Sequence, residues 1–285
     1  MLYVQSLWSK PLFDEQLALK KIGWLNKRAF YYGVTLSALL LDKYNPNDTL
    51  LITDKLGKKL LIDILELPYK DVVIELDCLN NYDAGLWALG KIYSYTIINK
   101  PFIHFDNDFF ICSRLPNNIE KSELCAWTPE VGRHFEKDVY QPALNNFIKE
   151  YKNLHPMVDF FIKEKYLYAY NAGILGGNNF SFFKELKDIV FFLINKNTSV
   201  LEKNHTFNII LEQYIFACLA HYYKKEVTCL EENFPPMYFS KKQAMHLLGY
   251  YKNEVSNCKD IEDILKIEFV EHYKKINELL RKNII

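Results

Sequence analysis

Two aspartates separated by one residue interrupt the apolar stretch PFIHFDNDFFI, residues 101 to 111. In an extended strand the side chains of residues i and i+2 point the same way, so Asp106 and Asp108 can direct both carboxylates at one cation. Such oxygen ligands suit Mg²⁺ or Mn²⁺. The alternative is that both are ordinary turn residues at a strand end. The acid-x-acid pattern is weak by itself and recurs at 75–77, 136–138 and 260–262.

A second stretch with chemical potential is HLLGYYK, residues 246 to 252, which has the form His-x-x-Gly-x-x-Lys. A neutral imidazole at His246 can complete the coordination of an ion such as Mn²⁺. Gly249 lets backbone approach a diphosphate closely, and Lys252 offers an ammonium to phosphate oxygens. The alternative is a core histidine followed by a tight turn and a solvated lysine. Together with the acidic pair, the stretch favours a split metal–diphosphate site.

These residues need a scaffold, and the hydrophobic pattern of the first 112 residues predicts one. Apolar runs alternate with segments of helical periodicity, with strands at 2–8, 49–54, 71–76 and 101–111 and helices at about 15–44, 57–67 and 82–98. This alternation predicts an α/β fold with a mostly parallel central sheet flanked by helices. Ligands of such sheets bind outside the carboxyl ends of the strands, where the aspartates lie.

The pattern is looser after residue 112. We predict a strand and loop at 123–132, a strand, turn and helix at 166–186, a helix at 206–224 and an amphipathic helix at 260–280. No internal repeat, low-complexity segment or clear linker is present. The sequence therefore predicts a single domain over residues 1–285.

Composition and charge exclude several classes of protein. The chain has 35 basic and 35 acidic residues, so its zero formal net charge predicts no general attraction to nucleic acid. The six cysteines form no C-x-x-C pair, which argues against a zinc ribbon or redox motif. The start lacks the features of a secretory signal, and no apolar window is long enough to span a bilayer. We expect a cytoplasmic protein with no nucleic-acid partner and no transmembrane segment.

Four short motifs together resemble the metal-dependent, nucleotide-sugar-using glycosyltransferases of the GT-A fold. The likeness is greatest to glycosyltransferase family 8 and looser to family 32. Those enzymes carry D-x-D, an N-[AS]-G segment, an acid-Gln pair on a helix and H-x-x-G-x-x-K. Here the corresponding stretches, in the same order, are DND (106–108), YNAGILGGN (170–178), LEQ (211–213) and HLLGYYK (246–252).

The resemblance implies a role for each matching residue. Asp106, Asp108 and His246 would bind Mn²⁺ or Mg²⁺. Donor binding would fall to Lys91, Asn107, Asn171, Gly173, Gly249 and Lys252. Gln213 would lie near the anomeric carbon, and Glu212 would bind sugar hydroxyls. The domain would then comprise a nucleotide-binding half (1–112), a donor-sugar and acceptor half (113–252) and a C-terminal helix (253–285).

The implied function is transfer of a sugar from a nucleotide donor, such as a UDP-sugar, to an acceptor that the sequence does not identify. A divalent ion and a lysine would stabilise the charge on the departing diphosphate. Family 8 likeness implies retention of configuration, and the weak nucleophilicity of Gln213 favours same-face attack over a covalent intermediate. The alternatives are a nucleotidyl- or phosphotransferase on a related α/β sheet and a non-catalytic nucleotide- or carbohydrate-binding module.

Overall fold

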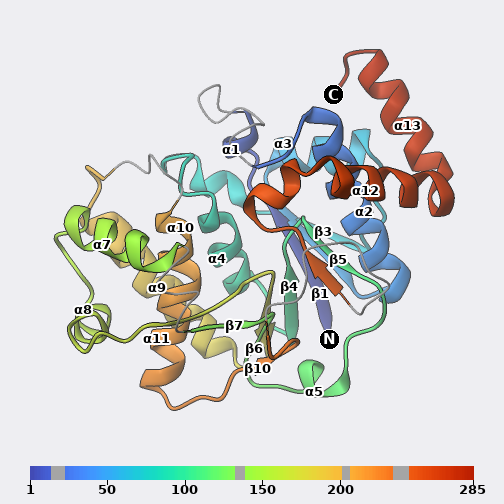
Figure 1. Ribbon diagram of the computed structural model, residues 1–285. Coiled ribbons are helices and arrows are strands. Elements are labelled where there is room, and N and C mark those ends of the chain that lie inside the picture. The colour runs from blue at the N-terminus through green and yellow to red at the C-terminus, as the bar shows by residue number, and fades with distance from the viewer. Residues whose placement is uncertain (14–22, 132–138, 201–205, 234–243) are drawn as a thin grey trace. The chain divides into compact units, whose positions relative to one another are not determined.

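The computed structural model describes residues 1–13, 23–131, 139–200, 206–233 and 244–285 (Figure 1). The chain forms two compact units, each assembled from segments that are distant in sequence. The terminal unit comprises Leu2–Asp77, Phe105–Leu115 and Pro235–Ile285; the middle unit comprises Cys78–His104 and Pro116–Phe234, together with Met1. The predicted single domain over 1–285 stays a prediction.

The terminal unit is built on three adjacent parallel strands. They are β1 (Leu2–Leu7), β2 (Thr49–Thr53) and β3 (Asp71–Ile74), with β2 between the other two. Tyr3 pairs with Thr49 and Leu50 with Asp71. Nearly every residue of β1 and β2 is buried, as expected of parallel strands covered on both faces. The three predicted strands are therefore confirmed, each one or two residues shorter than expected.

Helix α2 (Lys27–Tyr44) packs in this unit and has clear end signals. The Asn26 side chain accepts a hydrogen bond from the Ala29 amide, which caps the first turn. This cap sets the start of the helix at Lys27, so the predicted helix at 15–44 is wrong at residues 23–26; its part before residue 23 lies outside the described residues. Against α2 packs α12 (Val255–Glu268), which is followed by α13 (Val270–Arg281). The predicted C-terminal helix is thus two helices.

The stretch 101–111 is not one strand. It forms β4 (Phe102–Phe105) and β5 (Phe109–Ile111), separated by a turn that the Phe109 amide closes on the Asp106 carbonyl at 3.0 Å. The prediction that the two aspartates alternate along a strand is therefore wrong. The physical reason is that β5 pairs antiparallel with β11 (Ala244–His246), so the chain bends between the two strands.

The middle unit contains four neighbouring strands in the order β10 (Thr228–Cys229), β6 (Cys125–Ala126), β9 (Ile174–Gly177) and β4, of which only the last residue, Phe105, is assigned to the terminal unit. Strand β10 is parallel to β6, and β6 is antiparallel to β9. Strands β7 (Pro129–Val131) and β8 (Tyr168–Tyr170) form a separate antiparallel pair. Gly176 allows β9 to lie against β4, because a Cβ there would come within 2.2 Å of the Phe102 carbonyl oxygen.

Helices complete the middle unit, and α4 packs against α9 (Figure 1). They are α4 (Ala88–Ile97), α5 (Asn117–Glu120), α7 (Tyr140–Glu150), α8 (Pro156–Lys163), α9 (Phe180–Lys196), α10 (Phe207–Ile209) and α11 (Ile215–Tyr222). A π-helical segment, Ile210–Tyr214, joins α10 to α11. The predicted helix at 206–224 is confirmed as this composite. The predicted helix at 82–98 starts six residues late, at Ala88.

Short helical turns complete the terminal unit. They are α1 (Lys10–Phe13), α3 (Lys55–Lys58) with the π-helical Lys59–Ile64, and the 3₁₀ turn Gly249–Asn253; a further 3₁₀ turn, Leu76–Leu79, lies where the chain passes to the middle unit. The predicted fold class is confirmed: the protein is α/β, with a mostly parallel central sheet flanked by helices. Among the described residues no helix has the length and hydropathy that crossing a bilayer requires.

Candidate functional site

Strand pairing within the terminal unit brings His246 to the two aspartates. In the β5–β11 ladder His246 lies opposite Phe109, and the Leu247 amide continues the ladder by donating to the Asp108 carbonyl at 3.0 Å. The histidine and Asp108 are 138 residues apart in sequence. The aspartates therefore converge with His246 because a turn meets the end of a neighbouring strand, and not through side-chain alternation along β4.

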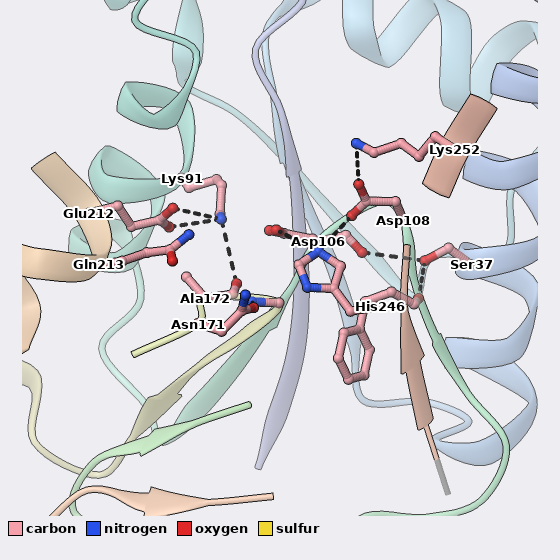
Figure 2. A network of polar contacts seen from close by, with 12 residues as sticks. Ser37, Lys91, Asp106, Asp108, Asn171, Ala172, Glu212, Gln213, His246 and Lys252 are labelled. Atoms are coloured by element: carbon pink, nitrogen blue, oxygen red, sulfur yellow. Dashed lines mark hydrogen bonds and ion pairs between the residues drawn. The ribbon is translucent and has the colours of Figure 1, made fainter. Parts of the chain in front are cut away.

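Asp106, Asp108 and His246 form a compact set of ligand atoms, hereafter the Asp–His cluster (Figure 2). The His246 Nε2 lies 3.2 Å from Asp108 Oδ1 and 3.4 Å from Asp106 Oδ2. One ligand atom from each residue lies within 4.8 Å of the others. Two carboxylates and one imidazole suit Mn²⁺, and also Mg²⁺ through the oxygens. The residues thus fit a divalent cation.

Neighbouring charges and hydrogen bonds together outweigh burial in setting the pKa values of His246 and Asp108. Burial lowers the pKa of His246, but the charge of Asp108, hydrogen bonds to both aspartates and the charge of Asp106 outweigh it, so the pKa is raised overall. Burial raises the pKa of Asp108, but the charges of Lys252 and His246 hold it well below its usual range. Lys252 forms an ion pair with Asp108 Oδ2. Asp108 is therefore ionised and shared between the imidazole and the ammonium.

Buried polar side chains hold the backbone of the aspartate turn. Gln5 donates to Ser37 Oγ at 2.8 Å and to the Asp106 carbonyl at 3.3 Å. Ser37 in turn donates to the Phe109 carbonyl at 2.7 Å, and Tyr69 donates to Gln5 Oε1 at 2.7 Å. Sequence reasoning missed these residues. A signal was available, because Gln5 and Ser37 are polar positions within the otherwise apolar faces of β1 and α2.

Asn107 has a structural bond of its own. Its side-chain amide donates to the Ser6 carbonyl at 2.9 Å, which fastens the turn to β1. The sequence assigned Asn107 to donor binding, and that role stays a prediction. The observed bond explains why the middle position of DND can carry a residue with an amide group: it supplies a donor that the β1 backbone accepts.

Gly249 and Lys252 lie in the 3₁₀ turn that follows β11. Gly249 has φ of +43°, a conformation that favours glycine, and a Cβ there would meet nothing within 4 Å. The Lys252 stem passes Gly23, and its Nζ lies 5.9 Å from the centre of the Trp24 ring. The lysine thus reaches Asp108 along a defined path.

The middle unit holds a second group of predicted site residues, hereafter the buried polar cluster (Figure 2). Its members are Lys91, Asn171, Gly173, Glu212 and Gln213. Lys91 on α4 lies 2.8 Å from Glu212 Oε1 and 3.5 Å from the Ala172 carbonyl. Tyr95, one turn along α4, donates to Glu212 at 2.5 Å. The Glu212 side chain is 0% exposed and that of Lys91 is 9% exposed. This buried carboxylate is thus paired with one cation and one hydroxyl.

Gln213 and Asn171 belong to the same cluster. The Tyr140 hydroxyl donates to Gln213 Oε1. Asn171 donates to Glu130 Oε1 at 2.7 Å, and its own Oδ1 accepts from the Gly173 amide at 2.9 Å. Burial, followed by the charge of Glu130, raises the pKa of Tyr140 well above its ordinary value, so the phenol stays protonated. Sequence reasoning missed Tyr95, Glu130 and Tyr140, which no motif marks.

The predicted residues therefore fall into two sets, each compact within its own unit. The terminal unit holds Asp106, Asn107, Asp108, His246, Gly249 and Lys252, and the middle unit holds Lys91, Asn171, Gly173, Glu212 and Gln213. The D-x-D and H-x-x-G-x-x-K motifs lie together in the terminal unit, and Lys91 contacts both the Asn-Ala-Gly and the Glu-Gln motif in the middle unit. The catalytic and binding roles of these residues stay predictions.

Fold and site define an α/β protein with a candidate divalent-metal site. The chain belongs to the family of unknown function DUF6734, which matches residues 1–279. No curated protein matches the sequence.

Several solved structures are similar to this chain. Apo GlyE, a glycosyltransferase of Streptococcus pneumoniae TIGR4, is 10% identical with a TM-score of 0.47, over 99% of this chain and 63% of GlyE. The galactosyltransferase LgtC, in complex with donor and acceptor sugar analogues, is 9% identical with a TM-score of 0.40, over 74% of this chain and 70% of LgtC. Mouse xyloside xylosyltransferase 1 is 11% identical with a TM-score of 0.38, over 80% of this chain and 84% of the mouse chain. This chain spans less than two thirds of GlyE.

Proposed function

We propose that the protein is a metal-dependent glycosyltransferase that uses a nucleotide-sugar donor, and that this donor is a UDP-sugar. The observation that carries the proposal is the Asp–His cluster with Lys252 ion-paired at its edge. Two carboxylates, one imidazole and one ammonium on rigid backbone are the groups needed to hold a cation and a diphosphate together. The order of motifs along the sequence, which resembles glycosyltransferase family 8, supports the same reaction.

The terminal unit is proposed to bind the diphosphate end of the donor. Asp106, Asp108 and His246 would hold Mn²⁺ or Mg²⁺, which when bound neutralises charge on the leaving diphosphate. Lys252 would pair with a phosphate oxygen, and Gly249, where a Cβ would meet nothing within 4 Å, leaves its backbone open to the same group. Gln5 and Ser37 would keep the aspartate turn in place while these groups bind.

The middle unit is proposed to bind the sugar. Glu212 accepts hydrogen bonds from sugar hydroxyls, Lys91 and Asn171 contribute donors, and Gly173 lines the pocket. Gln213 lies beside the anomeric carbon in this proposal. Because an amide is a weak nucleophile, Gln213 would stabilise an oxocarbenium-like state rather than form a covalent intermediate. The acceptor would then attack from the same face that the diphosphate leaves, so the configuration is retained.

A donor panel tests the proposal. Purified protein is incubated with UDP-, GDP- and dTDP-sugars, with Mn²⁺ or with EDTA, and released nucleoside diphosphate and thermal shift are both recorded. We expect one donor to be hydrolysed slowly and to raise the melting temperature of the protein when Mn²⁺ is present, and to do neither in EDTA. Asp108→Asn should lose both effects, whereas Asp188→Asn, at an exposed aspartate of the middle unit, should keep them.

Two results would contradict the proposal. If no nucleotide sugar is hydrolysed and none shifts the melting temperature in Mn²⁺, the protein is not this kind of transferase. If nucleoside triphosphates are consumed with release of pyrophosphate while nucleotide sugars are inert, the nucleotidyltransferase alternative is correct instead. Proton NMR of the product anomer then separates retention from inversion for an active donor.

A further inference from the structure

We infer that Lys252 competes with the divalent cation for Asp108, so that cation binding releases the lysine to the donor diphosphate. The inference rests on the proposed function, because it assigns a cation and a diphosphate to the Asp–His cluster. It adds a coupling device: one carboxylate decides whether Lys252 is committed to the protein or available to the substrate.

The competition follows from the two oxygens of Asp108. Oδ2 forms the ion pair with Lys252, while Oδ1 lies 3.2 Å from His246 Nε2 within the ligand set. The Asp108 and Lys252 side chains are only 13% and 15% exposed, so solvent screens their charges weakly. A dication on Asp108 would lie close to the ammonium and repel it. The ammonium of Lys252 and the divalent cation therefore compete for Asp108, and the binding of one weakens the binding of the other.

The backbone around Lys252 is fixed, so that release involves the side chain alone. The Lys252 carbonyl accepts from the Leu25 amide at 3.1 Å, and the preceding Tyr251 carbonyl accepts from Asn257 at 3.1 Å. The Trp24 ring, 5.9 Å from Nζ, offers the ammonium a favourable neighbour other than a carboxylate. A four-carbon stem on rigid backbone can thus swing without refolding the turn.

Charge balance gives the direction of the coupling. Asp106 and Asp108 together carry two negative charges, and a divalent cation neutralises both. Lys252 then has no carboxylate charge left to balance its own, and a diphosphate supplies it. Cation binding therefore strengthens donor binding, and by linkage donor binding strengthens cation binding to the same degree.

The experiment measures Mn²⁺ affinity by electron paramagnetic resonance of free Mn²⁺, without nucleotide and with saturating UDP. The wild type is compared with Lys252→Met, Lys252→Gln, Lys252→Arg and the control Lys259→Met, an exposed lysine on α12. Without UDP, Lys252→Met and Lys252→Gln should each bind Mn²⁺ about tenfold tighter than wild type, a typical coupling magnitude. With Mn²⁺ present, both should bind UDP about tenfold more weakly. Lys252→Arg, which keeps the charge, and Lys259→Met should match wild type in Mn²⁺ affinity.

The outcomes separate this inference from the proposed function. If wild type binds no Mn²⁺ with or without UDP, both are wrong. If wild type binds Mn²⁺ and the folded Lys252→Met and Lys252→Gln variants bind it equally or more weakly without UDP, the competition is wrong and the metal site stands. Circular dichroism melts in EDTA establish that the variants are folded. Tighter Mn²⁺ binding combined with weaker UDP binding supports the inference.

Discussion

Glu212 in the middle unit and Asp108 in the terminal unit are both carboxylates paired with a lysine, yet their settings differ. The Glu212 side chain is 0% exposed, lies within a helical segment and also accepts from Tyr95. The Asp108 side chain is 13% exposed, lies on a turn and shares its oxygens between Lys252 and His246. The first arrangement uses protein partners to stabilise a buried charge. The second concentrates charge where an external cation can be bound.

The difference predicts that Glu212 matters for stability in addition to its proposed contact with sugar hydroxyls. Replacing it with alanine leaves the Lys91 ammonium buried without its carboxylate, which costs about 3–5 kcal/mol of the free energy of unfolding. Urea denaturation of Glu212→Ala measures this loss. Glu226→Ala, at an exposed glutamate of the same unit, should change the free energy by less than about 0.5 kcal/mol.

A double variant sharpens this expectation. Lys91→Met combined with Glu212→Leu removes both charges, so most of the lost stability should return. A double variant as unstable as Glu212→Ala would show that packing around α4, and not the unpaired charge, sets the cost.

For Asp108 the expected loss is in metal binding. Asp108→Asn should weaken Mn²⁺ binding by more than about 100-fold, beyond the 10–100-fold typical of residues that only support a ligand. The free energy of unfolding in EDTA should change far less than for Glu212→Ala. Isothermal titration with Mn²⁺ gives the affinity, and an unchanged affinity would remove Asp108 from the ligand set.

Two glycines extend the comparison to the backbone. Gly176→Ala places a Cβ within 2.2 Å of the Phe102 carbonyl oxygen, so we expect a loss of at least about 3 kcal/mol, the upper end for overpacking. Gly249→Ala meets no atom within 4 Å, and only its φ of +43° opposes it, at about 1 kcal/mol. Thermal melts of both variants test the ranking, and a reversed order would contradict the geometry at β9.

The smallest effect concerns the support of the aspartate turn. Ser37→Ala removes the hydroxyl that donates to the Phe109 carbonyl and accepts from Gln5, which should cost about 1–2 kcal/mol of stability. Mn²⁺ affinity should fall by about tenfold, at the lower end for supporting residues. Ser256→Ala, at an exposed serine on α12, is the control and should leave both quantities unchanged.

Much of the fold could be predicted because it follows local patterns. The runs that became β1, β2 and β3 are apolar and short, and the α2 segment has helical periodicity, although its start was predicted too early because the capping Asn26 was not recognised. The break of 101–111 could not be predicted, because β5 turns away to pair with β11. In that register Phe110 lies opposite Met245, 135 residues downstream. Residues 101–111 contain no pattern that indicates pairing with β11.

The candidate site divides in the same way. Motif spacing predicted that His246 would join Asp106 and Asp108, and the three do lie together. The supporting residues escaped prediction because their function depends on tertiary neighbours: Ser37 is one polar position on a long helix, and Tyr140 acquires its partner Gln213 only through packing. Motifs mark groups that can meet ligands, whereas the residues that orient those groups carry no spacing of their own.

The β5–β11 ladder also joins residues that are synthesised at different times. His246 follows Asp108 by 138 residues, so at roughly 5–20 residues per second the aspartates leave the ribosome about 7–28 s before the histidine. During that interval the turn has neither its imidazole nor its lysine. The proposed cation site, which needs all three side chains, is therefore complete only once residue 246 has been made, and a nascent chain that stalls earlier carries the acidic turn without it.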